Sequence, residues 1–295
     1  MNDRAAPTTT EATIAIVVLT CGRVHLLRQC VENVLGRTSP ATREIVIWDN
    51  GSTDGTAGYL KALTDPRIRV VRHERNIGLN AYAEAFALTS ADYLVELDDD
   101  VIDAPARWDA TLLAAFRELP EMGFLSTGLV DDPHDAAAHL MHHVHSYTTV
   151  EELGHRLLLG PVGGHCAMTS RELYDLVGGF RRQRDSFFQE DGQYASSVIA
   201  AGYRAATLAD LQLTHAGGPH YSAQPREKIE YWERYRRRAA RRQAAKRTLL
   251  AIPGMAALNR RRGWFVPPDE VRGGVATADL FLGAPPSDAS AHGPR

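Results

Sequence analysis

The sequence predicts an α/β protein built around a mostly parallel sheet. Three observations support this fold class: short apolar runs recur along the first hundred residues, segments of helical spacing separate them, and polar residues follow each run where it ends. Strands that alternate with helices form parallel sheets with right-handed crossovers, and ligands bind at the carboxyl ends of the strands. With 295 residues, of which 44% are hydrophobic, the chain can bury a large core.

Four strands are expected in the first hundred residues, because each run is apolar and rich in β-branched residues. They are residues 14–19, 44–48, 68–71 and 93–97. The helices expected from the spacing of apolar residues are 24–35, 55–63 and 79–90. We therefore expect the functional side chains just after each strand.

The sequence of the second half of the chain predicts a less regular alternation of strands and helices. The expected strands are residues 123–130 and a stretch near 204–208. The expected helices are 108–119, 171–177 and a helix to Ala201 that follows a loop ending in Gln189-Glu190-Asp191. Residues 131–160 are rich in histidine, and we expect irregular structure there.

Composition argues against several classes of protein. The three cysteines, Cys21, Cys30 and Cys166, show no CxxC spacing, so a disulfide framework is not expected and a reducing cytoplasm fits best. The N-terminus lacks the apolar stretch of a secretory signal, and no window reaches the ~18 apolar residues of a membrane span. We expect a cytoplasmic protein, soluble or peripheral at the inner face of the membrane.

The net charge of −3 is distributed unevenly. Residues 226–262 hold 13 Lys and Arg against three Glu, a balance of +10, so the rest of the chain sums to −13. We expect a basic helix over 231–246, and two interpretations of it stay open. It suits peripheral contact with an anionic membrane, or it is a solvated helix that packs against the α/β domain or a second copy in a homo-oligomer. We expect no nucleic-acid partner.

Three consecutive carboxylates, Asp98, Asp99 and Asp100, follow the apolar run YLVEL. Like charges at one sheet end repel and raise one another's pKa, so a cation is expected there. Because side chains alternate along an extended segment, Asp98 and Asp100 would point the same way and Asp99 aside, which suits Mg²⁺ or Mn²⁺ holding a diphosphate. The alternative is a solvated turn or helix cap.

A second acidic site, Glu190-Asp191, follows the aromatic pair Phe187-Phe188. A carboxylate beside aromatic residues in a partly dry pocket is a candidate general base. The alternative is that these residues cap the helix that they begin.

Four ordered segments together cover about residues 13–220. They are IAIVVLTCGR, EIVIWDNGSTDGT, RNIGLNAYAEAFALTSADYLVELDDDV and PVGGHCAMTSRELYDLVGGFRRQRDSFFQEDGQYASSVIAAGYR. With these segments in this order, the chain resembles the family 2 glycosyltransferases. The resemblance implies a GT-A fold, a Rossmann-like and mostly parallel central sheet flanked by helices, here with a basic helical C-terminal extension. It also implies an inverting transferase that moves a sugar from a UDP- or dTDP-sugar to an acceptor hydroxyl, with Mn²⁺ or Mg²⁺ at a DxD motif.

The resemblance also implies roles for individual residues. Asp191 would be the general base, with Glu190 beside it, and Asp49 would accept the ring N–H of uracil or thymine. The metal ligands would be Asp98, Asp100 and His215. The residues expected to bind the nucleotide sugar are Thr20, Arg23, Asp49, Asn76, Gly78, Asp98, Asp99 and Gly164, and Gly163 would also allow close backbone approach.

The sequence departs from the family in two places. The first loop, usually Pro-Thr-Tyr-Asn-Arg, reads Leu-Thr-Cys-Gly-Arg over residues 19–23, so the aromatic partner of the base is absent and the preferred base stays open. The usual acceptor region is a histidine-dense stretch, residues 134–165. A zinc site at His139, His142 and His143 is one interpretation, and acceptor-loop or surface histidines are the other.

The expected organisation is a flexible leader over 1–12, a catalytic domain over 13–222, a basic helical extension over 223–266 and a disordered tail over 267–295. The catalytic domain would divide into a nucleotide-binding half, 13–105, and an acceptor-binding half, 106–222. A dinucleotide-dependent oxidoreductase is disfavoured because TCGRVH lacks GxGxxG, and a nucleotidyltransferase because no glycine-rich, lysine-bearing phosphate loop is present. A catalytically inactive protein of GT-A fold, which binds nucleotide sugars or acts as a scaffold, is the alternative function.

Overall fold

The computed structural model describes residues 12–182, 190–224, 226–262, 264 and 282. The predicted leader and tail, and the pair Phe187-Phe188, therefore lie outside the described residues except for Ala12 and Leu282. The chain divides into two compact units. Unit 1 comprises Met1–Gly128 and Tyr147–Thr214, and unit 2 comprises Leu129–Ser146 and His215–Arg295. The predicted domain boundary after residue 222 stays a prediction.

Unit 1 is built on a sheet whose first four strands are parallel. They are β1 (Ile14–Thr20), β2 (Thr42–Asn50), β3 (Ile68–His73) and β4 (Tyr93–Asp98), in the spatial order β3-β2-β1-β4. All four lie where the sequence predicts strands. Strands β1, β2 and β4 carry buried runs that suit a sheet covered on both faces, whereas β3 at the sheet edge is exposed or half-buried. The register pairs Thr20 with Asp49 and Leu19 with Asp98, so these strands end at a common edge.

The sheet continues beyond β4 as β9-β6-β10-β8-β7, and β5 pairs with β10. The bounds are β5 (Val101–Asp103), β6 (Met122–Leu129), β7 (Thr148–Glu152), β8 (His155–Leu159), β9 (Cys166–Ser170) and β10 (Arg204–His215). Strand β9 is antiparallel to β4, as are β7 and β8 to each other. The mixed sheet, parallel over its first four strands, confirms the predicted fold class.

The expectation of irregular structure over 131–160 is wrong, because the hairpin of β7 and β8 lies within it. Its two-residue loop, Leu153-Gly154, has φ values of 51° and 84°. Positive φ at both loop positions matches the right-handed twist of hairpin strands. Leucine at the first of these positions is not the usual Asn or Asp, so the turn has a weak sequence signal.

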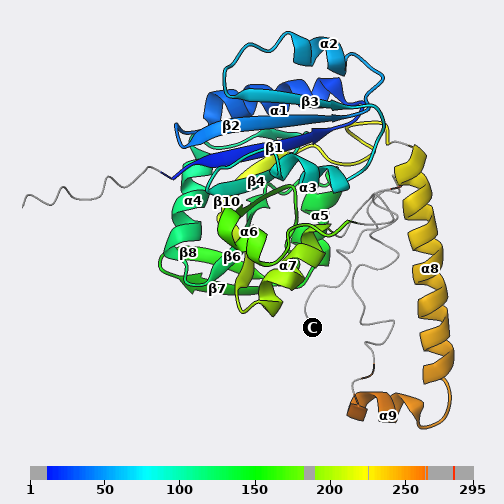
Figure 1. Ribbon diagram of the computed structural model, residues 1–295. Helices are drawn as coiled ribbons and strands as arrows, with labels where there is room; N and C mark the ends of the chain where they lie inside the picture. The colour runs from blue at the N-terminus through cyan, green and yellow to red at the C-terminus, as the bar shows by residue number, and fades with distance from the viewer. Residues whose placement is uncertain (1–11, 183–189, 225, 263, 265–281, 283–295) are drawn as a thin grey trace, which may run out of the picture. The chain divides into compact units, whose positions relative to one another are not determined.

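Helices cover both faces of the sheet (Figure 1). One face packs on α1 (Val24–Arg37), α2 (Thr56–Lys61) and α4 (Trp108–Glu118), and the other on α3 (Asn80–Phe86), α6 (Arg171–Leu176) and α7 (Glu190–Ala200). Alternate residues of β1 serve the two faces: Ile16 and Val18 join the first core, Val17 and Leu19 the second. Each fully buried side chain of this size contributes roughly 1.5–3 kcal/mol of transfer free energy.

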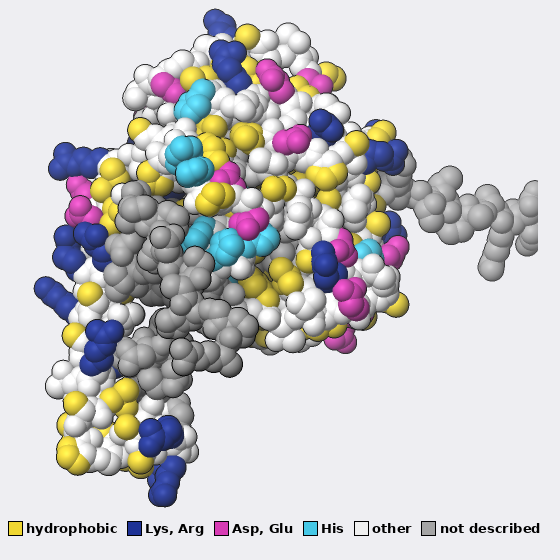
Figure 2. Space-filling view, turned by 180° about the vertical axis from the view of Figure 1, so that it is seen from behind, with side chains coloured by type: hydrophobic (Ala, Val, Ile, Leu, Met, Phe, Trp, Pro, Cys, Tyr) yellow, Lys and Arg dark blue, Asp and Glu magenta, His cyan; other side chains and the backbone are white. Residues whose placement is uncertain are grey.

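Unit 2 contains α5 (Ala136–His139), the π-helical turn η1 (Leu140–Val144), α8 (Arg226–Leu250) and α9 (Met255–Arg262). Helix α8 contains the predicted basic helix and extends it at both ends. Figure 2 shows Lys and Arg side chains spaced along α8. None of the helices in the described part of the chain has both the length and the apolar character needed to cross a bilayer.

Candidate functional site

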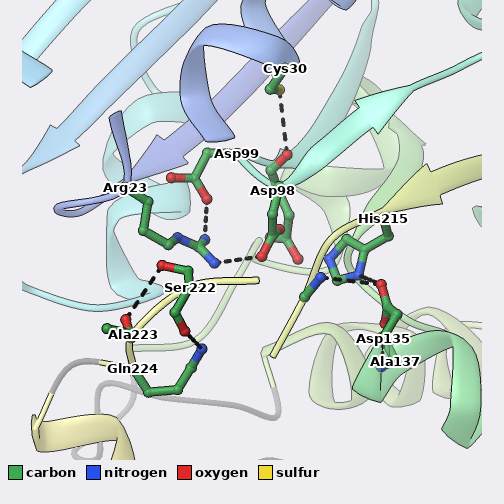
Figure 3. A network of polar contacts seen from close by, with 12 residues as sticks. Arg23, Cys30, Asp98, Asp99, Asp135, Ala137, His215, Ser222, Ala223 and Gln224 are labelled. Carbon is green, nitrogen blue, oxygen red and sulfur yellow. Dashed lines mark hydrogen bonds and ion pairs between the residues drawn. The ribbon is translucent and has the colours of Figure 1, made fainter. Parts of the chain in front are cut away.

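The acidic run lies at the carboxyl end of β4, where Asp98 is the last strand residue and Asp99 and Asp100 form a turn before β5. Both turn carboxylates pair with Arg23, whose two terminal nitrogens contact Asp99 and Asp100 separately. Figure 3 shows the contact between Arg23 and Asp99. Asp99 is fully buried and Asp100 nearly so. Ligand atoms of Asp98 and Asp100 lie within 4.8 Å of each other, as expected, although the chain turns at Asp99 instead of continuing as a strand.

Arg23 is held in place by the start of α1. Its carbonyl accepts hydrogen bonds from the backbone of Leu26 and Leu27, both at 3.0 Å. Sequence reasoning assigned Arg23 to the nucleoside, whereas the structure places its guanidinium on the acidic run. Burial raises the pKa of Asp99 to about 6, even though Arg23 opposes this rise. The run therefore needs positive charge, and Arg23 supplies part of it.

Asp49 ends the neighbouring strand β2 and is fully buried. Its Oδ1 accepts the Ser52 backbone N–H at 2.8 Å, and its Oδ2 lies 3.3 Å from Nε of Arg72. The Ser52 hydroxyl in turn accepts the Gly22 N–H at 2.8 Å, which ties the loop after β1 to the loop after β2. These contacts fix the Asp49 carboxylate at the sheet edge. Thr20, the last residue of β1, is buried beside it in the strand register.

The loop between β3 and α3 is positioned by Asn50, a residue that the sequence analysis did not select. The Asn50 amide donates to the Gly78 carbonyl and accepts from the Ile77 N–H, both at 3.0 Å. Asn76 accepts from the Gly78 N–H at 2.7 Å. Gly78 has a φ of +63°, a conformation that glycine adopts without strain. Asn76 and Gly78 thus belong to a loop pinned to the end of β2.

A second group of carboxyls lies at the start of α7. Asp191 accepts two backbone hydrogen bonds, from Gly164 to Oδ2 at 3.0 Å and from Gly192 to Oδ1 at 2.6 Å. Burial raises the pKa of Asp191 to about 6 although both hydrogen bonds lower it. Burial and the neighbouring Asp191 raise the pKa of Glu190 well above its usual range. One of these carboxyls can therefore accept a proton near neutral pH while the other keeps one.

Glu96 belongs to this group and was missed. It is 1% exposed, and an added Cβ on Gly164 would stand 2.9 Å from its Oε1 and 3.3 Å from Cβ of Asp191. Gly164 therefore lies between the two side chains, and any larger residue there would collide with a carboxyl group. Burial, followed by the charges of Glu190 and Asp191, raises the pKa of Glu96 well above its usual range. The signal was a charged residue inside the apolar run YLVEL.

His215 ends β10 and belongs to unit 2. Its Nδ1 lies 2.5 Å from Oδ2 of Asp135 (Figure 3). The other oxygen of Asp135 caps α5 by accepting from Ala137 and Ala138 at 2.7 and 2.9 Å. A carboxylate on Nδ1 makes that nitrogen the donor and Nε2 the nitrogen with the lone pair, which is how metal-binding imidazoles are commonly held.

The residue types at these positions fit a divalent cation. Asp98 and Asp100 in unit 1 are carboxylates that could serve as ligands, and His215 in unit 2 offers a ring nitrogen of the kind that ligates metals. Asp99 and Asp100 are buried and pair with the Arg23 guanidinium, which agrees with a site that takes up positive charge. Mn²⁺ accepts both oxygen and imidazole ligands. Mg²⁺ also suits a site in which most of the ligands are oxygens.

The histidine-dense stretch has other contacts. His142 Nε2 lies 2.7 Å from the Leu129 carbonyl, His143 Nε2 lies 3.0 Å from Asp131, and buried His165 contacts the Thr127 carbonyl at 3.0 Å. Within the residues that the structure describes, no group able to hold a metal contains His139, His142 or His143. The described contacts give the zinc interpretation no support.

Comparison with protein families identifies a long match. Residues 15–178 match the profile of glycosyl transferase family 2. The chain is also 25% identical over 248 residues to the uncharacterized protein y4gI of Sinorhizobium fredii (strain NBRC 101917 / NGR234), a match that covers 75% of this chain. The chain spans 27% of the length of that relative.

Several solved structures share the fold. The mannosyltransferase PcManGT from Pyrobaculum calidifontis, in complex with GDP-Man and Mn²⁺, aligns with a TM-score of 0.54 at 22% identity over 94% of this chain and 72% of that one. GalNAc-T7 with UDP, GalNAc and Mn²⁺ aligns at 0.53 and 16% identity over 70% of this chain and 44% of that one. S. aureus TarS 1-349 in complex with UDP-GlcNAc aligns at 0.50 and 16% identity over 77% of this chain and 66% of that one.

Proposed function

Because the chain belongs to glycosyl transferase family 2, we propose that it transfers a sugar from a nucleotide diphosphate sugar to an acceptor hydroxyl, with inversion at the anomeric carbon. The observation that carries this proposal is the common strand edge: Asp49 on β2 and the acidic run on β4 flank the end of β1. Such an edge can hold a nucleoside on one side and a metal-bound diphosphate on the other.

The donor would be a UDP- or dTDP-sugar. A carboxylate fixed by the Ser52 N–H, as Asp49 is, can accept the ring N–H of uracil or thymine. Thr20, Asn76 and Gly78 would frame the nucleoside. Two structural neighbours were solved with UDP or UDP-GlcNAc and one with GDP-Man, so guanine, which also presents a ring N–H, belongs in any donor screen.

Asp98 and Asp100 would hold a divalent cation, Mn²⁺ or Mg²⁺, which would neutralise the departing diphosphate. The assignment of His215 as a third ligand stays a prediction. Asp135 would orient His215 by accepting from Nδ1. Arg23 would remain on Asp99 and limit the repulsion within the acidic run. Two of the neighbouring structures contain Mn²⁺, which supports testing this ion first.

Asp191 would act as the general base. Its two backbone hydrogen bonds hold the carboxylate in one orientation, and its pKa of about 6 leaves it ionised at neutral pH yet basic enough to take the acceptor's proton. As Asp191 takes the proton, the oxygen of the acceptor hydroxyl attacks the anomeric carbon and the bond to the diphosphate breaks. A single displacement therefore inverts the configuration. Glu190 would keep its proton, so that the Glu190-Asp191 pair carries one negative charge.

Gly164 would bind the donor sugar or the acceptor through its backbone, since its lack of a side chain leaves room beside Asp191 and Glu96. The acceptor hydroxyl could belong to a polysaccharide, a lipid-linked sugar or a natural product. In the donor assay, purified protein, Mn²⁺ and a panel of UDP-, dTDP- and GDP-sugars are followed by release of the nucleotide. Tight binding of a nucleotide with no hydrolysis or transfer, unchanged by Asp191→Asn, would instead identify an inactive binding protein.

A further inference from the structure

Helix α8 carries a one-sided cluster of arginines. Arg234, Arg237, Arg238, Arg241 and Arg242 follow the spacing i, i+3, i+4, i+7, i+8, which places them on a single face of a helix. All five are exposed. Over about 12 Å of helix axis they form what we call the arginine stripe.

Acidic residues do not offset the stripe along most of the helix. Residues 234–262 hold 11 Lys and Arg and no Asp or Glu. Glu230 and Glu233 lie at the start of α8, where Glu230 pairs with Arg226 at 2.8 Å and Glu233 with Arg237 at 3.3 Å. The part of the stripe beyond Arg237 therefore has no carboxylate three or four residues away on the helix, and it attracts polyanions.

The opposite face of α8 is the more buried one. Trp232 is 5% exposed, and the half-buried residues that follow it at helical spacing are Tyr235, Ala239, Gln243 and Lys246. Most of the stripe points away from this face, because Arg234, Arg237, Arg238 and Arg241 are offset from Trp232 by about 120–180° around the helix axis, and Arg242 by about 80°. Packing of α8 therefore leaves the arginines at the surface.

The segment after α8 adds exposed apolar side chains to the positive charge. Ile252, Leu258 and Trp264 are 51%, 37% and 55% exposed, and Arg260 to Arg262 lie among them. A phosphate backbone of nucleic acid binds arginine but does not require exposed aliphatic groups. A bilayer interface accommodates both, since lipid phosphates take the arginines while tryptophan and leucine enter the interfacial layer.

We propose that α8 and the following segment dock the protein on an anionic lipid surface. The arginine stripe binds the lipid headgroups, and Ile252, Leu258 and Trp264 insert at the headgroup boundary. The docking is peripheral, and it is independent of the donor site in unit 1, so vesicle binding and sugar transfer can succeed or fail separately.

The test is flotation of the full chain with phosphatidylcholine vesicles and with vesicles that also contain phosphatidylglycerol, at low and high salt. The stripe variant is Arg238→Gln with Arg241→Gln. The matched control is Arg236→Gln with Arg247→Gln, which removes the same charge from the opposite side of the same helix. Each basic residue near an anionic surface changes partitioning about fivefold, so the stripe variant should bind roughly twenty- to thirty-fold more weakly and the control should change little.

Tryptophan fluorescence gives a second readout. Trp264 is 55% exposed, whereas Trp48, Trp108 and Trp232 are at most 6% exposed, so a blue shift with anionic vesicles reports Trp264 and should vanish in Trp264→Phe. Salt-sensitive binding that the stripe variant loses and the control keeps would support the proposal. No binding to phosphatidylglycerol vesicles, equal losses in both variants, or tighter binding to duplex DNA than to these vesicles would overturn it.

Discussion

Replacing Asp191 by asparagine tests the proposed general base with little change in shape. Asparagine keeps one oxygen for one of the two backbone donors, Gly164 and Gly192, and turns an NH₂ toward the other. One lost hydrogen bond of this kind costs about 1–3 kcal/mol of folding free energy, so the variant should fold. Loss of the base should slow transfer by about 10²- to 10⁴-fold, or about 3–5 kcal/mol in the activation barrier, while donor binding is retained.

The pH profile provides the sharper readout. Burial raises the pKa of Asp191 to about 6, and a base must be unprotonated, so kcat/KM of the parent protein should rise with pH through about 6 and then level off. The assay is nucleotide release at substrate concentrations below saturation over about pH 5 to 8, with donor affinity measured by calorimetry. A variant that keeps the parent rate, or that keeps the limb near pH 6, would refute the assignment of Asp191.

Three further substitutions test other parts of the account. Asp109 is fully buried and accepts hydrogen bonds from the Ser39 N–H and from the hydroxyls of Ser39 and Thr42 at 2.7–2.8 Å. In urea denaturation, Asp109→Ala should therefore lower the free energy of unfolding by about 3 kcal/mol or more. The control, Asp103→Ala at an exposed aspartate, should change it little. Burial raises the pKa of Glu96, so the free energy of unfolding should fall as pH rises above about 4.5 toward the pKa of the folded protein. Glu96→Gln should reduce the slope of this fall by up to about 1.4 kcal/mol per pH unit. Equal slopes for the two proteins in pH-dependent denaturation would contradict this. Asp135→Asn should weaken Mn²⁺ binding about 10- to 100-fold by releasing Nδ1 of His215, an effect that titration calorimetry would detect and that unchanged affinity would exclude.

The first half of the fold could be predicted because its central strands, β1, β2 and β4, are largely apolar on both faces. Runs such as residues 14–19 have no polar alternation and no helical period, so burial within a parallel sheet was the consistent interpretation. The hairpin of β7 and β8 gave no such signal. Its strands are largely exposed or half-buried, and its turn, Leu153-Gly154, lacks the usual Asn-Gly or Asp-Gly pair.

The candidate site was predictable where a residue's role follows from its position at a strand end. Asp49 and the acidic run come directly after buried strands, and the sheet register brings β1, β2 and β4 to one edge. Contacts set by helix orientation or by distant loops were not predictable. Arg23 reaches Asp99 across 76 residues because α1 starts beside the turn after β4, and Asp135 meets His215 across 80 residues.

The measurement that tests the central claim most directly is donor binding by the parent protein and by Asp100→Ala, with and without Mn²⁺. Titration calorimetry with UDP, dTDP and GDP would identify the preferred nucleotide. If the acidic run holds the metal and the metal holds the diphosphate, Mn²⁺ should strengthen nucleotide binding to the parent protein and have no such effect on Asp100→Ala. Equal affinity of the two proteins in the presence of Mn²⁺ would contradict a metal-dependent donor site at the end of β4.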